Sequence, residues 1–263
     1  CFYIFLSHIF TTNNPFINLN IFLNKNYFLG LLIMFLFGTI LWTPLILYPP
    51  MMQDLQNYPE DLTGVFLALR GLGTLCGSTL LVFINKKLDP RFILSVGFLL
   101  QGIAGFYMSH FDINLSAFEL AWTNSLAGLG VGFVWVPLTL ITFNTLDKKF
   151  LNEASAFWHL IRNIGSSISI SITIALVIRS TAINYADLSS FISIFGDSTS
   201  VMPLKGTTAP SGAESLSGLS KEIVRQSEMI GYINAFHLYY WIAFSIIPLV
   251  WLAPLKPQNK IGH

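Results

Sequence analysis

Polar and charged side chains recur at three- and four-residue steps inside one long apolar stretch of the sequence. The stretch reads AFWHLIRNIGSSISIS and runs from Ala156 to Ser171. In a helix, this spacing places the polar residues on one face. They are Ser155, His159, Arg162, Asn163, Ser166, Ser169 and Thr173. Such a face either lines an aqueous path or packs on a neighbouring helix through small residues and hydrogen bonds.

Of these residues, Arg162 most strongly limits what the face can contact. A guanidinium in the middle of a membrane helix is costly unless it faces water, the protein interior or a partner group. Packing alone rarely needs such a group, so we expect Arg162 to face a cavity. For the serines and Gly165 the sequence favours a packing role, and His159 is compatible with either role.

The composition of the chain identifies its class. Hydrophobic residues make up 53% of the sequence and charged residues 10%, whereas a soluble domain has about a quarter of its residues charged. Six apolar stretches are long enough to cross a bilayer. They run approximately from 27 to 50, 62 to 84, 92 to 109, 120 to 146, 154 to 178 and 235 to 255. We therefore predict an all-α, polytopic helical membrane protein, and a net charge of +1 gives no indication of nucleic-acid binding.

The predicted organisation has five parts. Residues 1–26 are expected to be the end of a truncated helix and a cytoplasmic linker, so that the chain is a fragment without its N-terminal part. Residues 27–178 hold five transmembrane helices, 179–234 form a long outer loop, 235–255 form the last transmembrane helix, and 256–263 form a tail. Its first part, about 181–195, mixes apolar and polar residues at roughly helical spacing, and its last part, 219–236, is predicted to be an amphipathic helix that runs into the final span. The long segment is interpreted as a connector on the membrane surface or as a docking surface for a partner outside the membrane.

Lysine and arginine in the short loops predict the orientation. One set of loops holds Lys25, Lys86, Lys87, Arg91, Lys148, Lys149, Lys256 and Lys260. The opposite short loops hold no lysine or arginine but do hold acidic residues such as Glu60 and Asp112. Basic loops face the cytoplasm. The C-terminal tail is therefore predicted to be cytoplasmic, and the segment 179–234 to lie outside.

Other intramembrane groups limit the possible functions. Arg70 is a second arginine within a predicted span, whereas no Asp or Glu lies deep in any span. A proton-coupled transporter usually needs an intramembrane carboxylate, so this chain is not expected to couple protons by itself. The sequence holds no HExxH, GxSxG or Walker motif and no Cys/His cluster with metal-ligand spacing. We therefore predict no enzyme activity, no cofactor and no metal site.

Several stretches together resemble the fourteen-helix drug:proton antiporters of the major facilitator superfamily, the EmrB/QacA type. NPFINLNIFLNKNYFLG resembles the family's linker into its ninth helix, and RGLGT with KKLDPRFIL resembles the tenth helix and the following loop. LGVGFVWVPLTLITFNTL resembles the twelfth helix, and AFWHLIRNIGSSISISI resembles the thirteenth. The resemblance covers nearly the whole chain and implies the C-terminal bundle of that fold.

The resemblance implies part of a multidrug efflux permease in a bacterial inner membrane, which exports amphipathic compounds by proton antiport. It implies cavity or gating roles for Arg162 and Asn163, with Trp135 and Phe157 nearby, and makes His159 and Ser166 further candidates; Arg70 would brace the bundle. The implied partners are the lipid bilayer, drug-like substrates, protons, and a periplasmic adaptor with an outer-membrane channel. The coupling carboxylates would lie in an absent N-terminal half.

Three alternatives remain open at this stage. The chain could be a membrane-embedded structural or assembly subunit, in which case Arg162→Ala would lower its abundance rather than export. It could be a non-functional remnant. It could also be a membrane enzyme of unrecognised chemistry, which would need a set of catalytic residues at one membrane face.

Overall fold

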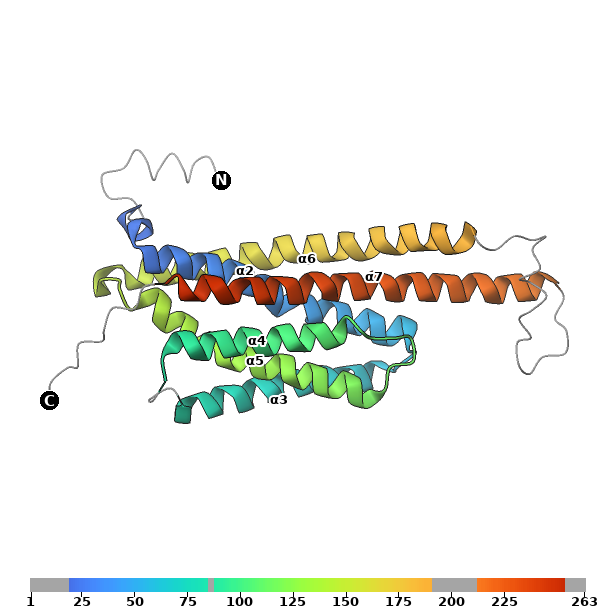
Figure 1. Ribbon diagram of the computed structural model, residues 1–263, viewed down its shortest axis with the longest axis horizontal. Helices are drawn as coiled ribbons and strands as arrows, with labels where there is room; N and C mark the ends of the chain where they lie inside the picture. The colour runs from blue at the N-terminus through green and yellow to red at the C-terminus, as the bar shows by residue number, and fades with distance from the viewer. Residues whose placement is uncertain (1–18, 85–87, 191–211, 254–263) are drawn as a thin grey trace.

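The described residues of the computed structural model, 19–84, 88–190 and 212–253, form a bundle of long helices (Figure 1). Six of their helices are long and apolar enough to cross a membrane, which confirms the predicted all-α, polytopic membrane fold. In chain order the elements are η1 (Leu19–Leu23), α2 (Lys25–Pro50), η2 (Met51–Leu55), α3 (Glu60–Ile84), α4 (Pro90–Met108), α5 (Ala117–Phe143), η3 (Lys148–Phe150), α6 (Leu151–Ser190) and α7 (Gly212–Trp251).

The starts of three helices follow from local sequence. The side chain of Asn24 caps α2 by accepting a hydrogen bond from the backbone N–H of Asn26 at 3.0 Å. Asp89 caps α4, where Pro90 occupies the first turn and has no N–H to satisfy. Ser116 and Glu119 form a reciprocal capping box at the start of α5. These caps fix the points at which the chain re-enters the bundle.

The first span, which the sequence predicted to end near residue 50, continues past the Pro49–Pro50 pair. Helix α2 continues through Pro50 and then widens into the π-helical turn η2, Met51–Leu55. Proline removes a backbone donor and crowds the carbonyl one turn earlier. The backbone N–H of Met51 restores the ladder by donating to the carbonyls of Leu47 and Tyr48. The helix can therefore include two consecutive prolines, because the residues that follow them form a wider, π-helical turn.

Glycines allow the helices of the bundle to approach closely. A Cβ added to Gly77 of α3 would lie 2.6 Å from the carbonyl oxygen of Leu129 in α5. A Cβ added to Gly38 of α2 would lie 2.6 Å from the carbonyl oxygen of Arg162 in α6. These distances are too short for a methyl group, so the two contacts need glycine. Close backbone approach through small residues is the usual basis of helix association in membranes.

Helices α6 and α7 are longer than a bilayer requires. Each has 40 residues, which gives about 60 Å of helix, whereas a hydrocarbon core is about 30 Å thick. Figure 1 shows them side by side, continuing past the ends of the other helices. Much of the segment 179–234 is therefore helical and continuous with the last two spans, which confirms the amphipathic helix predicted at 219–236. Its residues 191–211 lie outside the described residues, as do 1–18 and the predicted tail.

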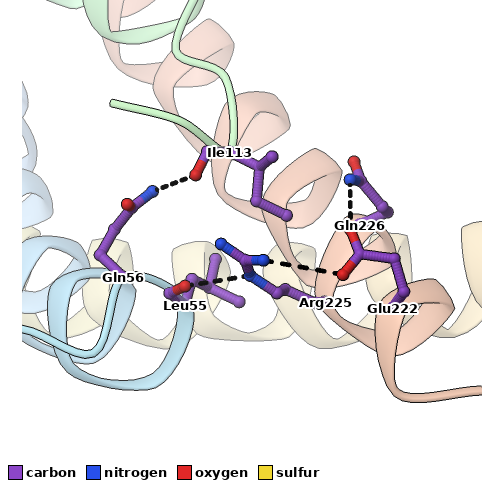
Figure 2. Close-up of polar contacts among 6 residues, drawn as sticks. All are labelled: Leu55, Gln56, Ile113, Glu222, Arg225 and Gln226. Carbon is purple, nitrogen blue, oxygen red and sulfur yellow. Dashed lines mark hydrogen bonds and ion pairs between the residues drawn. The ribbon is translucent and has the colours of Figure 1, made fainter. Parts of the chain in front are cut away.

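Hydrogen bonds attach this extension to the rest of the bundle. The Nε of Arg225 in α7 donates to the carbonyl oxygen of Leu55 at 3.1 Å, and an Nη pairs with Glu222 at 3.6 Å (Figure 2). The side-chain amide of Gln56 donates to the carbonyl oxygen of Ile113 at 2.8 Å. We call the end of the bundle that holds Leu55, Ile113 and Arg225 the distal end. These bonds join the end of η2 to α7 and to the α4–α5 connection.

Candidate functional site

Arg162 and Trp135 meet from different helices. The guanidinium of Arg162, on α6, lies 5.6 Å from the centroid of the Trp135 ring, on α5. Its Nε and one Nη donate to the side-chain oxygen of Asn163 at 3.3 and 3.2 Å. In the described part of the chain, no carboxylate lies within ion-pair distance of Arg162. An aromatic face and an amide thus fix the position of the guanidinium without neutralising its charge. The charge can therefore attract an anionic or polar group.

A row of aromatic rings supports the Trp135 indole. Its centroid lies 5.9 Å from that of Trp158 on α6 and 6.0 Å from that of Phe37 on α2, both in edge-on geometry. Trp158 and Phe37 are buried. Edge-to-face pairs add stability beyond the burial of area. The ring under Arg162 is therefore fixed by two helices, while Arg162 itself is half-buried.

One side of the exposed surface of α6 is lined by polar residues. His159, Asn163, Ser167 and Ser171 follow one another at four-residue steps, and all four are exposed. We call these four residues the α6 polar stripe. The hydroxyls of its two serines donate to the backbone carbonyls of residues 163 and 167, at 3.0 and 3.1 Å. The stripe thus offers polar groups along a span without breaking the helix.

The structure separates the predicted polar face into two parts. Ser166, Ser169 and Thr173 are buried, not exposed with the stripe, and Ser166 and Ser169 face α2. The hydroxyl of Ser166 donates to the carbonyl oxygens of Arg162 at 2.8 Å and Gly38 at 3.3 Å. The absence of a side chain at Gly38 lets α6 approach closely enough for this bond. Ser166, a candidate for the cavity, accordingly lies in a helix interface.

Two other predicted residues precede Arg162 on α6, and only one of them adjoins the centre formed by Arg162, Asn163 and Trp135. The His159 ring packs against Trp158, with centroids 5.0 Å apart, one turn before Arg162. The Phe157 ring packs edge-on against Phe22 of η1, with centroids 4.9 Å apart. His159 thus extends the centre along the stripe, whereas Phe157 points toward a different neighbour.

Arg70 lies deep in the bundle, away from this centre. It is 4% exposed, and one Nη donates to the carbonyl oxygen of Leu41 in α2 at 3.2 Å. Tyr48 and Tyr239 lie beside it. Tyr239 donates to Gln101, whose amide donates to the carbonyl oxygen of Ala127 at 2.8 Å. The cluster ties five helices together, which is the arrangement that a bracing residue needs.

Sequence reasoning did not select Gln101, Tyr239 or Trp158. A lone glutamine in an apolar span was a signal for Gln101, because a buried amide needs partners. Nothing in the sequence distinguished Trp158 from the other aromatic residues of the spans. Among the residues that the structure describes, no three His, Cys, Asp or Glu side chains gather in a way that could hold a metal ion.

Comparison with known proteins gives consistent matches. The sequence model of the Major Facilitator Superfamily matches residues 7–170. The chain is 24% identical over 254 residues to the multidrug export protein EmrB of Escherichia coli K12, covering 96% of the chain and 49% of that protein. It is 26% identical over 250 residues to the probable multidrug resistance protein EmrY of the same strain, covering 92% of the chain and 48% of that protein.

A third relative has a different described role. The fatty acid resistance protein FarB of Neisseria gonorrhoeae is 22% identical over 252 residues, covering 94% of the chain and 49% of that protein. The chain spans about half the length of the curated relatives it matches. The matches therefore concern only part of each relative.

Proposed function

Because this chain belongs to the Major Facilitator Superfamily, we propose that it forms one helical bundle of a transporter that exports amphipathic compounds. The observation that carries the proposal is Arg162. Its charge has no carboxylate partner in the described residues, and it lies over Trp135 beside the exposed α6 polar stripe. A charged group placed in this way inside a membrane indicates a substrate or ion pathway.

The residues suit compounds with an apolar body and a polar group. Trp135 supplies a flat apolar face, and Arg162, Asn163 and His159 supply polar contacts. In transporters of this kind two bundles rock about a shared cavity and expose it to each side in turn. The α6 polar stripe would line that cavity, and the exposed face of α6 would meet the second bundle. Similarity to proteins named for multidrug export supports this assignment.

The proposal includes an energy source and a membrane orientation. We propose proton antiport in a bacterial inner membrane, with the basic loops and the C-terminus in the cytoplasm and the distal end outside. Basic residues such as Lys25 and Lys148 lie at the other end of the bundle, and acidic residues such as Glu60 lie at the distal end, which supports this orientation. The remaining half of such a transporter would supply the coupling carboxylate.

The projecting part of α6 and α7 suits a partner outside the membrane. Both helices continue past the other four, and Arg225 fixes α7 to the end of η2 (Figures 1 and 2). We propose that this extension contacts a periplasmic adaptor of a three-part pump. A rigid helical pair is a better docking element than a mobile loop, because less conformational entropy is lost on binding.

A dye-export assay tests the transporter assignment. Expression of the complete reading frame that contains this chain, in an efflux-deficient bacterial strain, should lower the accumulation of the neutral amphipathic dye Nile red. A protonophore should abolish the difference, because it removes the driving force. If accumulation is unchanged while the protein is present in the membrane, the exporter assignment is contradicted and a structural or assembly role is favoured.

A further inference from the structure

A groove of about 340 Å³ lies between α6 and α7, which run side by side (Figure 1). Helix α6 contributes five of its lining residues and α7 contributes one: Leu176, Arg179, Ser180, Ile183, Asn184 and Asn234. The groove is separate from the centre at Arg162, because Arg179 lies about 26 Å further along the same helix.

The groove lies at the boundary of the membrane. The apolar stretch of α6 ends at Ile178 and that of α7 begins at Ala235, so Arg179 and Asn234 are the residues next to the two spans. From Glu153, the charged residue that precedes the span of α6, the helix rises about 39 Å to Arg179. A bilayer is about 40–45 Å thick when its headgroups are included. Arg179 therefore lies in the headgroup layer nearer the distal end.

Two asparagine side chains form a polar floor in the groove. The amide nitrogen of Asn234 donates to the hydroxyl oxygen of Ser180 at 2.6 Å and so joins α7 to α6. The amide nitrogen of Asn184 donates to the carbonyl oxygen of Ser180 at 2.7 Å and to its hydroxyl oxygen at 3.2 Å. Ser180 itself is buried. An amide whose nitrogen donates in this way presents its oxygen as an acceptor, so the floor suits a group that carries N–H or O–H donors.

Arg179 brings a positive charge to this floor. Its side chain is exposed, and in the described part of the chain it has no hydrogen bond and no ion pair. A guanidinium suits phosphate, because it can donate two parallel hydrogen bonds to it. Leu176 and Ile183 supply apolar walls. Ile172 and Ile168, one and two turns before Leu176, continue an exposed apolar surface toward the membrane interior.

We propose that this groove binds one glycerophospholipid of the bilayer. The lipid phosphate pairs with Arg179, a hydroxyl or ammonium group of the headgroup donates to the asparagine oxygens, and an acyl chain lies along Ile172 and Ile168. A soluble anion would satisfy Arg179 but would leave the apolar surface uncovered, which favours the lipid. The inference goes beyond the proposed function, because this lipid is a bound component and not an exported compound.

Native mass spectrometry of the protein tests the site directly. Protein expressed from the complete reading frame that contains this chain, purified in detergent, should bind a first dioleoyl phosphatidylglycerol more tightly than dioleoylglycerol, which has the same acyl chains without phosphate. Arg179→Gln should weaken binding of the phospholipid about fivefold and leave dioleoylglycerol unaffected. Arg179→Lys keeps the charge and should retain most of the binding.

Lys221 provides the matched control. It is an exposed cation of α7, about 20 Å along that helix from Asn234 and outside the groove, so Lys221→Gln should leave binding unchanged. Millimolar inorganic phosphate should not displace the lipid, because it makes no apolar contact.

Three outcomes would overturn the inference. The first is wild-type phospholipid affinity in Arg179→Gln. The second is an equal loss in Lys221→Gln, which would show only general attraction by surface charge. The third is displacement of the lipid by inorganic phosphate, which would show a simple anion site. None of these outcomes affects Nile red export by the wild-type protein, so the proposed function is tested separately.

Discussion

Replacing Arg162 by alanine should abolish export while the protein remains at its normal level in the membrane. The guanidinium makes no ion pair in the described part of the chain, so its removal leaves no buried carboxylate unpaired. Its contacts are the Trp135 ring and the side chain of Asn163, its neighbour in sequence. The loss should therefore affect the transport path rather than the fold. Dye accumulation and quantitative immunoblotting of membranes measure the two effects separately.

Two variants sharpen this prediction. Arg162→Lys keeps the charge but loses the planar group that stacks on Trp135, so we expect partial export. Ser245→Ala removes an exposed hydroxyl of α7 that lies outside the α6 polar stripe and is bonded to its own helix, and should retain export. Full export by Arg162→Ala at equal expression would contradict a role in the transport path. A proportional fall in protein abundance and export would instead indicate a structural role.

Replacing Gly73 by alanine should strongly destabilise the bundle. The added Cβ would collide with the carbonyl oxygen of Ser125 on α5, and backbone of this kind cannot move aside without shifting the helix. Overpacking of a tight contact typically costs about 1–3 kcal/mol. We expect a lower midpoint of thermal unfolding and less monodisperse protein after extraction in detergent.

Gly71, two residues earlier on the same helix, provides the matched control. A Cβ added there meets no atom within 4 Å. Alanine favours a helix over glycine by up to about 1 kcal/mol, so Gly71→Ala should leave the thermal midpoint unchanged or raise it. Equal midpoints for Gly73→Ala and Gly71→Ala would show that close approach of α3 and α5 does not stabilise this bundle.

Much of the fold could be predicted because the bilayer imposes simple constraints. Apolar stretches of sufficient length indicated the six spans, and the polar connections between them indicated where each span ends. Helical spacing indicated an amphipathic helix running into the last span, but not how far α6 and α7 extend as continuous helices. Beyond the hydrocarbon region, a helix with exposed polar residues has the composition of a loop. Its stability depends on the neighbouring helix, as in the bond from Asn234 to Ser180 at 2.6 Å.

The candidate site could be predicted only in part. Helical spacing placed Arg162 and Asn163 on one face with the serines, and resemblance to a family added Trp135. Spacing alone could not divide that face, because a helix position faces a neighbour or a cavity according to where the neighbour lies. Gly38 on α2 brings that helix against Ser166 and Ser169, while Ser167 and Ser171, on an adjoining part of the same surface, remain exposed.

Cysteine accessibility along α6 tests the central claim, that the α6 polar stripe lines an aqueous path within the membrane. Single cysteines at Ser167, Ile168 and Ser169, in a chain with Cys1 and Cys76 replaced by serine, compare three consecutive positions. Ser167 belongs to the stripe, Ile168 is exposed but apolar, and Ser169 is buried. A charged thiosulfonate reagent needs an ionised thiol in contact with water.

The account predicts rapid modification of Ser167→Cys in open membranes and slow modification of Ile168→Cys and Ser169→Cys. Arg162 would then lie beside water, as its role in transport requires. If Ser167→Cys reacts as slowly as the other two, the stripe faces lipid or another helix, and the proposed path along α6 is contradicted.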